Sequence, residues 1–204
     1  MKFDLHIHSK YSGDCRMEPA DILKTAKKVG LDGVAITDHD TVRGGLEASR
    51  IDSDIEVITG AEIRTNRGEV IGYFLNEEIK GKDFFEVTDA IRDQGGIVCI
   101  PHPFDVFRVY RLKPTEEVLG VADCIEVLNS RCTVNSMNEK ARRLAEERGL
   151  GMTAGSDAHY ISEIGASGVI VDAPEDLRNK KAEIFGGTSS FRELAVKKIT
   201  RVFR

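Results

Sequence analysis

The sequence is poor in the residues and patterns that mark several large classes of protein. Its 204 residues contain no tryptophan, five prolines and four cysteines. No apolar run approaches the roughly 18–20 residues that a membrane-spanning helix needs, so we expect no membrane segment. No Gly-x-Gly-x-x-Gly follows a strand-like run, and a dinucleotide-binding fold therefore has no support.

The cysteines and the first residues bear on the compartment. Cys15, Cys99, Cys124 and Cys132 show neither Cys-x-x-Cys spacing nor a zinc-finger pattern. Two of them lie in apolar strand-like runs, where a small buried thiol is the simplest interpretation. The start, Met1-Lys2-Phe3-Asp4, leads directly into a pair of histidines, so we expect no signal peptide. These features predict a reduced, cytoplasmic setting.

Composition and charge indicate one ordinary globular domain over residues 1–204. Hydrophobic residues make up 41% of the chain and charged residues 31%, with a net charge of −5. A chain without a global basic field is not expected to bind duplex nucleic acid. A short strand or a nucleotide could still bind at a local patch.

Strand and helix patterns alternate along the chain, which is typical of βα units around a parallel sheet. The predicted strands are 2–8, 33–37, 55–64, 69–75, 97–100, 124–128, 152–154 and 168–171. Apolar stripes predict helices between 19 and 30, between 84 and 95 and between 134 and 149. The runs 55–64 and 69–75 flank Asn66-Arg67-Gly68 and predict a hairpin. The charged tail over 173–204 is predicted to be helical and to pack on the rest of the domain.

All five histidines lie at the ends of apolar runs, beside acidic or small polar residues. They are His6, His8, His39, His102 and His159. Neutral imidazole is the commonest metal ligand in proteins, and histidines clustered with carboxylates indicate metal or catalytic sites. The pattern therefore predicts a metalloenzyme.

The first two strand ends offer histidines with nearby carboxylates. His6 and His8 are two residues apart on a strand, so both side chains leave the same face; the alternative is a buried pair bonded to backbone carbonyls. Asp14 follows on a glycine-containing loop and could equally be a turn residue. In Thr37-Asp38-His39-Asp40, a metal could bind His39 while Asp38 orients an imidazole from behind. Asp40 and Thr41 are expected to cap the next helix.

The later strands each deliver one or two polar residues. Glu62 ends the third strand and could bridge two metals, or it is a surface glutamate. His102 stands between two prolines that fix its backbone, and a buried core histidine is the alternative. Asn129 could offer a carbonyl oxygen or cap a turn, and Asp157 and His159 follow the last of these strands. Polar residues at several strand ends favour a (β/α) barrel, and because the chain is short for eight full units, a seven-stranded or a distorted barrel fits better.

The order His-x-His, Thr-Asp-His-Asp-Thr, Gly-Ala-Glu, Pro-His-Pro and Gly-Ser-Asp-Ala-His resembles the PHP (polymerase and histidinol phosphatase) family of metal-dependent phosphoesterases. The resemblance spans residues 3–159. It implies a distorted seven-stranded (β/α) barrel with two or three divalent metals at the carboxyl ends of the strands. By position, it implies one metal on His6, His8, Glu62 and Asp157, a second on Glu62, His102 and Asn129, and a third on Asp14, His39 and His159.

Two positions depart from the pattern of some family members. Those members carry histidine where this chain has Asp14, which changes the charge of a ligand. Others carry histidine where Asn129 stands, and an amide oxygen is a weaker ligand. Mixed imidazole and carboxylate ligands suit zinc, manganese or iron alike, and ligand type does not choose among them.

The resemblance implies hydrolysis of a phosphate monoester of a small metabolite or nucleotide. Metals about 3.5–4 Å apart would lower the pKa of a shared water towards neutrality and so supply hydroxide. Glu62, Asp157 and His159 are the expected catalytic residues. Arg108 and Arg131 lead the cations expected to bind the phosphate of a small phosphorylated substrate.

Three alternatives stay open. A nuclease acting on a short single-stranded oligonucleotide would need a basic groove with aromatic platforms, and Tyr11, Phe104, Phe107 and Tyr110 are the aromatic residues near the motifs. A non-catalytic subunit such as the PHP-like one of ribonuclease P would not keep the ligand set. A hydrolase of carbon–nitrogen bonds would need a bridging lysine carboxylate, and no lysine stands at a strand end.

Overall fold

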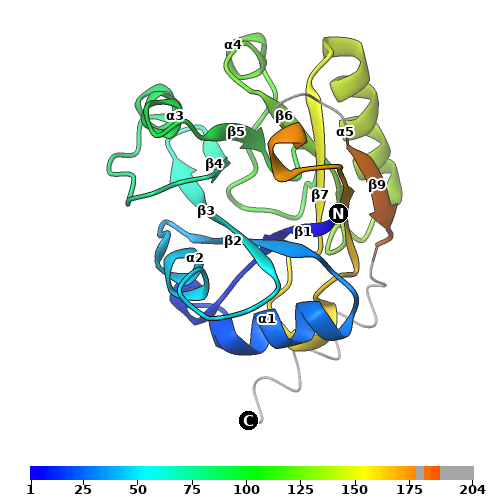
Figure 1. The fold of residues 1–204 in the computed structure, drawn as a ribbon. Coiled ribbons are helices and arrows are strands. Elements are labelled where there is room, and N and C mark those ends of the chain that lie inside the picture. The colour runs from blue at the N-terminus through cyan, green and yellow to red at the C-terminus, as the bar shows by residue number, and fades with distance from the viewer. Residues whose placement is uncertain (178–181, 189–204) are drawn as a thin grey trace.

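The fold was analysed in a computed structural model that describes residues 1–177 and 182–188. Strands gather at the centre of the molecule, and α1, α3 and α5 lie outside them (Figure 1). The elements in chain order are β1 (Lys2–Ile7), η1 (Lys10–Ser12), α1 (Pro19–Lys28), β2 (Gly33–His39), α2 (Arg43–Ala48), β3 (Glu56–Thr65), β4 (Gly68–Tyr73), α3 (Phe84–Asp93), β5 (Ile97–Ile100), α4 (Glu116–Leu119), β6 (Cys124–Asn129), α5 (Asn135–Arg148), β7 (Gly151–Gly155), η2 (Ile161–Glu163), β8 (Ser167–Ile170), η3 (Pro174–Leu177) and β9 (Glu183–Gly186).

Local sequence signals set most helix ends. α1 starts at Pro19, whose missing N–H is no loss in a first helical turn. The Asp83 carboxylate caps α3 by accepting bonds from the backbone N–H groups of Phe85 and Glu86. α5 ends at Arg148 and is followed by Gly149, whose φ of 61° suits glycine. The expected cap of α2 is not formed by Asp40, because its carboxylate accepts a bond from the Arg64 backbone instead.

The strands form a barrel-shaped sheet, as predicted, but with nine strands in the described residues instead of seven. Their order is β7-β6-β5-β4-β3-β2-β1-β8-β9. β4 runs antiparallel to both β3 and β5 and forms the predicted hairpin with β3, whereas the other neighbours among β1–β7 are parallel. A bridge between Ile7 and Ala158, just after β7, brings the two ends of the seven-stranded run together. β8 and β9 extend the sheet beyond that ring.

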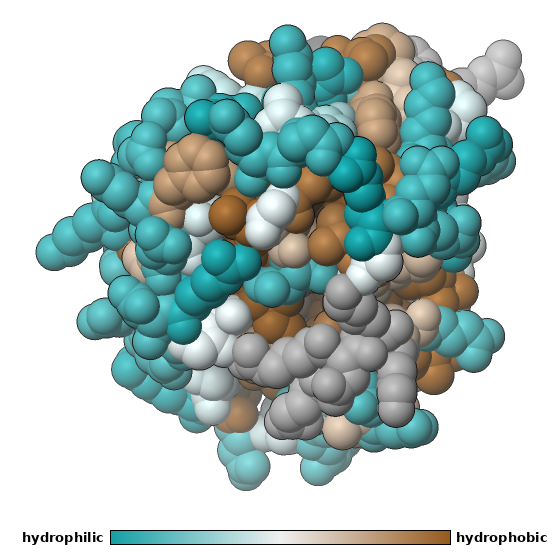
Figure 2. Space-filling view, turned by 90° about the horizontal axis from the view of Figure 1, so that it is seen from above, coloured by the Kyte–Doolittle hydropathy of each residue, from teal (hydrophilic) through white to brown (hydrophobic). Residues whose placement is uncertain are grey.

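Apolar side chains fill the barrel and the space beneath the helices. One buried cluster takes residues from each of the strands β1–β7, so it occupies the inside of the barrel; we call it the interior cluster. Its members include Phe3, Leu5, Ala35, Ile58, Tyr73, Cys99, Cys124 and Ala154. Two further clusters join the sheet to α3 and α5 on one side and to α1 on the other. Seen from above, the surface is mostly hydrophilic, with hydrophobic residues in the recesses (Figure 2).

The prediction of a helical tail over 173–204 is wrong where the structure describes it. Pro174–Leu177 forms one short 3₁₀ turn, and Glu183–Gly186 forms β9, which pairs antiparallel with β8. The strand is favoured because the ring of Phe185 packs closely over Gly168, where a Cβ atom would lie 2.8 Å from the ring. Residues 178–181 and 189–204 lie outside the described residues. Within the described part, no helix is long and apolar enough to cross a membrane.

Candidate metal centre

The predicted ligands come together at the mouth of the barrel, because parallel strands end at one face. β1, β2, β3, β5 and β7, or the residues just after them, each supply at least one side chain. We call the assembled set the ligand cluster: His6, His8, Asp14, His39, Glu62, His102, Asp157 and His159. Asp14 joins from the loop after β1. Asp14 is half-buried, and the other seven are buried or nearly so.

One group of the ligand cluster consists of His6, His8 and Asp157, all fully buried. The two Nε2 atoms are 3.2 Å apart. Asp157 Oδ1 lies 3.4 Å from Nε2 of His8 and 3.8 Å from Nε2 of His6. Two imidazoles and a carboxylate oxygen that face one another at these distances form a set of donors that one cation can hold.

Glu62 stands at the centre of the ligand cluster and turns its two oxygens to different partners. Its Oε2 lies 3.5 Å from Nε2 of both His6 and His8 and 3.2 Å from Nδ1 of His39. Its Oε1 lies 2.9 Å from Nε2 of His102. Glu62 lies within β3 and not at its end, and a fully buried carboxylate divided in this way has the arrangement that a bridging ligand would need.

A third group lies nearer the surface. Nε2 of His159 is 3.2 Å from Oδ2 of Asp14, and Nε2 of His39 is 3.5 Å from the same oxygen. The rings of His39 and His159 both flank His8, with centroid separations of 4.5 and 4.3 Å. The three histidines and Asp14 could therefore hold a cation at the outer end of the centre.

Hydrogen bonds behind the rings fix which nitrogen of each imidazole faces the centre. His6 Nδ1 lies 2.9 Å from the Glu126 carboxylate, and His159 Nδ1 lies 2.9 Å from the backbone oxygen of Asp157. Because both partners accept only, each Nδ1 must carry the proton. The Nε2 lone pairs of these two histidines are thus available to a metal.

His8 is oriented through a relay that includes the predicted Asp38. The Ser12 hydroxyl donates to Asp38 Oδ1 at 3.0 Å and lies 2.8 Å from His8 Nδ1. Since the single hydroxyl proton goes to the carboxylate, His8 Nδ1 donates to Ser12 and its Nε2 keeps a lone pair. Asp38 therefore acts on His8 through Ser12, and Gly44 makes room because a Cβ there would lie 2.0 Å from its carboxylate.

Electrostatics give three groups of the ligand cluster the protonation states that metals need, whereas two histidines must lose a proton when a metal binds. Burial would lower the pKa of His6 and of His39, but neighbouring carboxylates outweigh it and raise the pKa of His6 well above its ordinary value and that of His39 to about 10. Burial lowers the pKa of His8 to about 3, assisted by the charge of His159, so its ring is neutral. Burial would raise the pKa of Glu62, but His6, His102 and His39 lower it well below its ordinary value. Burial of Asp157 is likewise outweighed by Arg108, which holds the pKa of that carboxyl well below its usual range.

Unpartnered buried atoms test whether a cation fits this set of donors. The described residues contain six buried side-chain nitrogen or oxygen atoms without a hydrogen bond, and five belong to the ligand cluster. These five are Asp14 Oδ1, His39 Nδ1, Glu62 Oε2, His102 Nδ1 and Asp157 Oδ1. Buried polar atoms are normally satisfied, and such a concentration of exceptions calls for an ion. Three of these atoms, His39 Nδ1, Glu62 Oε2 and Asp157 Oδ1, lie within 4 Å of another donor of the cluster, so the donors present fit divalent metals.

Backbone strain is also concentrated at the mouth. His102 and Asp157 have positive φ values of 29° and 55°, and Asp40, next to His39, has 56°. Residues other than glycine adopt such angles only where the surrounding structure enforces them, and they gather at functional sites. The strain follows from turning these side chains back over the barrel.

Asn129 does not present its oxygen to the ligand cluster, in contrast to the predicted ligand role. Its Oδ1 accepts a bond from the Arg131 backbone at 2.9 Å. Its amide nitrogen donates to Glu126 at 3.0 Å and to Asp157 Oδ2 at 3.2 Å. The amide is therefore turned so that its donor, and not its acceptor, faces the carboxylates, which places Asn129 among the residues that support the ligands.

The two predicted phosphate-binding arginines differ in position. Arg108 reaches the ligand cluster, and its Nη2 donates to Asp157 Oδ2. Arg131 instead pairs with Glu163 at 3.2 Å, and Glu163 accepts the backbone N–H of His159. Arg131 therefore touches the cluster only indirectly.

Two buried glutamates beside the cluster escaped the sequence analysis. Glu126 accepts from His6 Nδ1 and from the backbone N–H of His102. Glu69 on β4 lies 4.0 Å from His39 Nδ1 and accepts from Arg64 at 3.4 Å. A charged residue inside an apolar strand was the available signal, but neither stands at the end of its strand.

An exposed apolar segment follows His102. Val106, Phe107, Val109 and Tyr110 are 60%, 71%, 89% and 48% exposed, and they flank Arg108 on both sides. Leu112, fully buried against Gly68, anchors the segment at one end. The backbone N–H of Glu69 also donates to the carbonyl of Tyr110. The segment is thus held in place while its apolar side chains face solvent.

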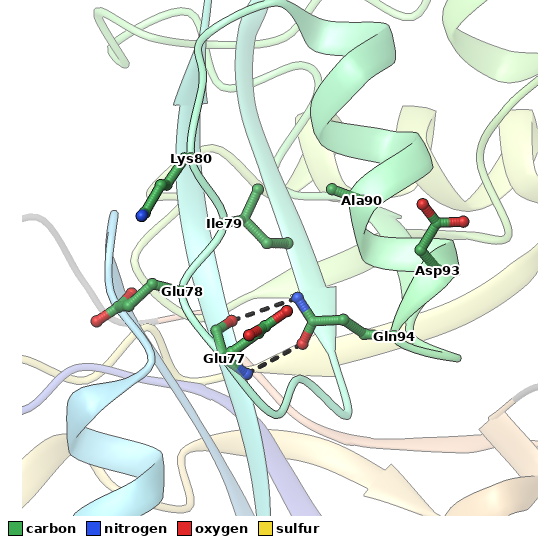
Figure 3. Close-up of a pocket in the computed structure, with 7 residues that line it drawn as sticks. All are labelled: Glu77, Glu78, Ile79, Lys80, Ala90, Asp93 and Gln94. Carbon is green, nitrogen blue, oxygen red and sulfur yellow. Dashed lines mark hydrogen bonds between the residues drawn. The ribbon is translucent and has the colours of Figure 1, made fainter.

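A cavity of about 380 Å³ lies apart from the ligand cluster, between α3 and the loop after β4 (Figure 3). Gln94 bonds across it to the backbone of Asn76 and Glu77. Its lining residues are Glu77, Glu78, Ile79, Lys80, Ala90, Asp93 and Gln94. None of them belongs to the ligand cluster, so this cavity does not contribute to the metal centre.

Comparisons with known proteins point to one family. A family model for the PHP domain matches residues 4–148, and one described as PHP-associated matches residues 135–184. An uncharacterised protein of Methanocaldococcus jannaschii is 37% identical, covering 89% of this chain and 77% of that protein. A probable phosphatase of Caldicellulosiruptor bescii is 25% identical, covering 91% of this chain and 94% of that protein.

In two further comparisons, the match covers a smaller share of the other protein. A 5'-3' exoribonuclease of Haemophilus influenzae is 42% identical over 67 residues, which is 32% of this chain and 24% of that protein. A two-domain protein of Bacteroides vulgatus that contains a predicted PHP-like metal-dependent phosphoesterase superimposes with a TM-score of 0.76 at 21% identity. That alignment covers 92% of this chain and 65% of the Bacteroides protein, and it supports the barrel fold.

Proposed function

We propose that this chain, which belongs to the PHP domain family, is a metal-dependent hydrolase of a phosphate monoester of a small metabolite or nucleotide. The observation that carries the proposal is the ligand cluster, where five of the six unpartnered buried atoms of the described residues lie. The similarity to a probable phosphatase over most of both chains supports the choice of substrate class.

In this proposal the metals are held by three groups of residues. His6, His8, Asp157 and Glu62 would hold one ion, and Asp14, His39 and His159 another. Glu62 and His102 would hold a third, for which Asn129 offers no oxygen in this structure. With the fewest protein ligands, that third position would bind its metal most weakly.

The residues of the chain have separable tasks in the proposed reaction. When bound, divalent metals would lower the pKa of a water and neutralise charge on the phosphoryl oxygens. Glu62, fully buried, would hold its two oxygens between the groups. Asp157 is fully buried, whereas the His159 side chain is 9% exposed. When the metal position of Asp14, His39 and His159 is not filled, His159 is therefore better placed than Asp157 to pass a proton to the leaving group at the mouth.

The exposed apolar segment is the proposed contact for the part of the substrate beyond the phosphate. It adjoins the ligand cluster through Arg108, and Phe107 offers an aromatic face that is 71% exposed. Tyr110 lies under the Arg64 guanidinium, 4.8 Å from the ring centre. A substrate with an apolar or planar group would cover part of this surface.

Nuclease activity on short single strands is the second candidate, favoured by two pairs of aromatic and basic residues. Arg43 lies 4.7 Å from the ring centre of Tyr11, and Arg64 pairs with Tyr110. Stacking platforms beside cations bind single-stranded nucleic acid. This candidate ranks second because Glu47 and Glu69, which contact Tyr11 and Arg64, would repel a phosphate backbone.

A phosphate-release screen tests the proposal. Purified protein is analysed for zinc, manganese and iron and then assayed on histidinol phosphate, nucleoside mono- and bisphosphates, sugar phosphates and a labelled oligonucleotide. Metal-dependent release from at least one monoester is expected. Cleavage of the oligonucleotide alone would establish nuclease activity. A protein that binds no metal, releases no phosphate and does not cleave the oligonucleotide would be neither a phosphatase nor a nuclease.

A further inference from the structure

The two oxygens of Asp157 have different surroundings. Oδ1 accepts no hydrogen bond and lies 3.4 Å from Nε2 of His8 and 3.5 Å from Nδ1 of His159. Oδ2 accepts bonds from Arg108 Nη2 and from the amide of Asn129. One oxygen is therefore saturated by donors of the protein, and the other is left free toward the imidazoles.

The fold aims Arg108 at this carboxylate from behind. Its Nε donates to Asp105 Oδ2 at 3.2 Å, and its side chain is 21% exposed. Asp105 is itself buried and is fixed by the Phe107 N–H at 3.1 Å. Its backbone N–H donates to the carbonyl of His102, which ties the turn to the ligand cluster. A guanidinium held by two carboxylates has a fixed direction.

We propose that Arg108 is a positioning residue for Asp157: together with Asn129 it occupies Oδ2, so that Oδ1 alone is presented to the metal. The inference rests on the proposed function only in assuming that the ligand cluster binds metal. It differs from the phosphate-binding role predicted for this arginine, because two of its donors are already engaged with Asp157 and Asp105.

The charges at the mouth explain why such a residue is needed. Four buried carboxylates have an oxygen within 4.0 Å of a ring nitrogen of the cluster's histidines, and among the described residues guanidinium groups contact two of them. The carboxylates are Glu62, Glu69, Glu126 and Asp157, and the contacts are Arg64 with Glu69 and Arg108 with Asp157. A buried carboxylate without a fixed partner is costly and free to turn. Arg108 removes that freedom from Asp157 without using the oxygen that faces the histidines.

The test measures metal binding without catalysis. Wild type, Arg108→Gln, Arg108→Lys and Arg148→Gln are stripped with chelator and titrated with Mn²⁺ by calorimetry. Loss of a residue that orients a ligand typically costs about 10- to 100-fold in metal affinity, and we expect this for Arg108→Gln. Arg108→Lys should recover part of the lost affinity, because lysine keeps the positive charge but lacks the planar guanidinium that donates to two carboxylates. Arg148, paired with the exposed Glu116, is the matched control and should change affinity less than about fivefold.

Two outcomes would overturn the inference. One is wild-type Mn²⁺ affinity in Arg108→Gln with a raised KM, which would make Arg108 a phosphate ligand. The other is an equal loss of affinity in Arg148→Gln. If Arg108→Gln does not fold, as judged by circular dichroism, Asp105→Asn replaces it and should weaken Mn²⁺ binding in the same direction. If the affinity falls as expected while wild type releases phosphate from no substrate, the proposed function fails and the inference stands.

Discussion

The inside of the barrel and its mouth are built on the same strands but obey opposite rules. The interior cluster consists of apolar side chains from every strand of the ring, packed against one another. The ligand cluster lies at the mouth of the barrel, nearer the carboxyl ends of the parallel strands. It contains imidazoles and carboxylates, and five of their buried atoms have no hydrogen bond. The first arrangement stabilises the fold, and the second is costly unless a ligand completes it.

This difference teaches how the site is maintained. Residues of the interior cluster gain free energy from burial alone, so their role ends with packing. Residues of the ligand cluster are held by partners behind them, such as Glu126 and Ser12, and by the strained backbone at His102 and Asp157. Mutations in the interior cluster should therefore change mainly the stability of the protein, and mutations in the ligand cluster mainly its activity.

The largest effect is expected for Glu62→Gln. Loss of several kcal/mol of metal-dependent charge stabilisation corresponds to about 10²- to 10⁴-fold in kcat/KM. The metal-free variant should also be less stable than metal-free wild type at neutral pH, because His6, His102 and His39 stabilise the buried Glu62 charge and hold its pKa well below its ordinary value.

Asn129→Ala is the comparison for this variant and should lose less activity, since its amide supports ligands without being one. Phosphate release and thermal unfolding of both metal-free proteins check the pair. Equal losses of activity would argue against a bridging role for Glu62.

Ile58→Ala should reduce the stability of the protein but not its activity. Ile58 belongs to the interior cluster and is 2% exposed, and deleting such a side chain costs about 2–5 kcal/mol of unfolding free energy. Urea unfolding of the metal-free protein measures the loss, and activity per folded molecule should stay near that of wild type. A large drop in that activity without loss of stability would break the separation between the two regions.

Glu126→Gln probes the boundary between the regions. The carboxylate accepts from His6 Nδ1, and an amide can present its nitrogen there instead, so the imidazole loses its fixed tautomer. We expect Mn²⁺ affinity to fall by about 10- to 100-fold, as is typical for partners behind a ligand. Unchanged Mn²⁺ affinity, measured by chelator competition, would show that His6 is oriented by other contacts.

The smallest effect is expected at the exposed apolar segment. Phe107→Ser should raise KM about 2- to 10-fold for a substrate with an aromatic group, as one aromatic contact is worth about 0.5–1.5 kcal/mol. Val29→Ser, on a residue 43% exposed at the end of α1, is the control. Steady-state kinetics compare an aromatic phosphate with a polyol phosphate. An unchanged KM for the aromatic phosphate would place the substrate elsewhere, and an equal rise for both would show that Phe107 does not recognise the aromatic group.

Sequence patterns anticipated the fold because strand ends and helix stops are local signals. The alternation of apolar runs predicted the strands β1–β8, and Pro19 and Gly149 marked helix ends. In the described part of the tail, the prediction of a helix was wrong because the charged composition resembles a helix, whereas Phe185 packs on Gly168. That contact depends on tertiary structure, which the pattern of the tail does not contain.

The candidate site was anticipated only as far as position along a strand can show. Ligands at strand ends converge in any parallel barrel, so the histidines, Glu62 and Asp157 could be identified. Glu126 is 120 residues from His6, and nothing in the sequence pairs them. The orientation of the Asn129 amide likewise depends on Arg131 and Asp157, which only the folded chain brings together.

Metal content is the most direct test of the central claim that the mouth of this barrel is a metal centre. Purified wild type and Glu62→Gln are reconstituted with zinc, manganese or iron, dialysed and analysed for bound metal per chain. Wild type should retain two or three ions and Glu62→Gln fewer. A wild-type protein that retains no ion under any of these conditions would contradict the account.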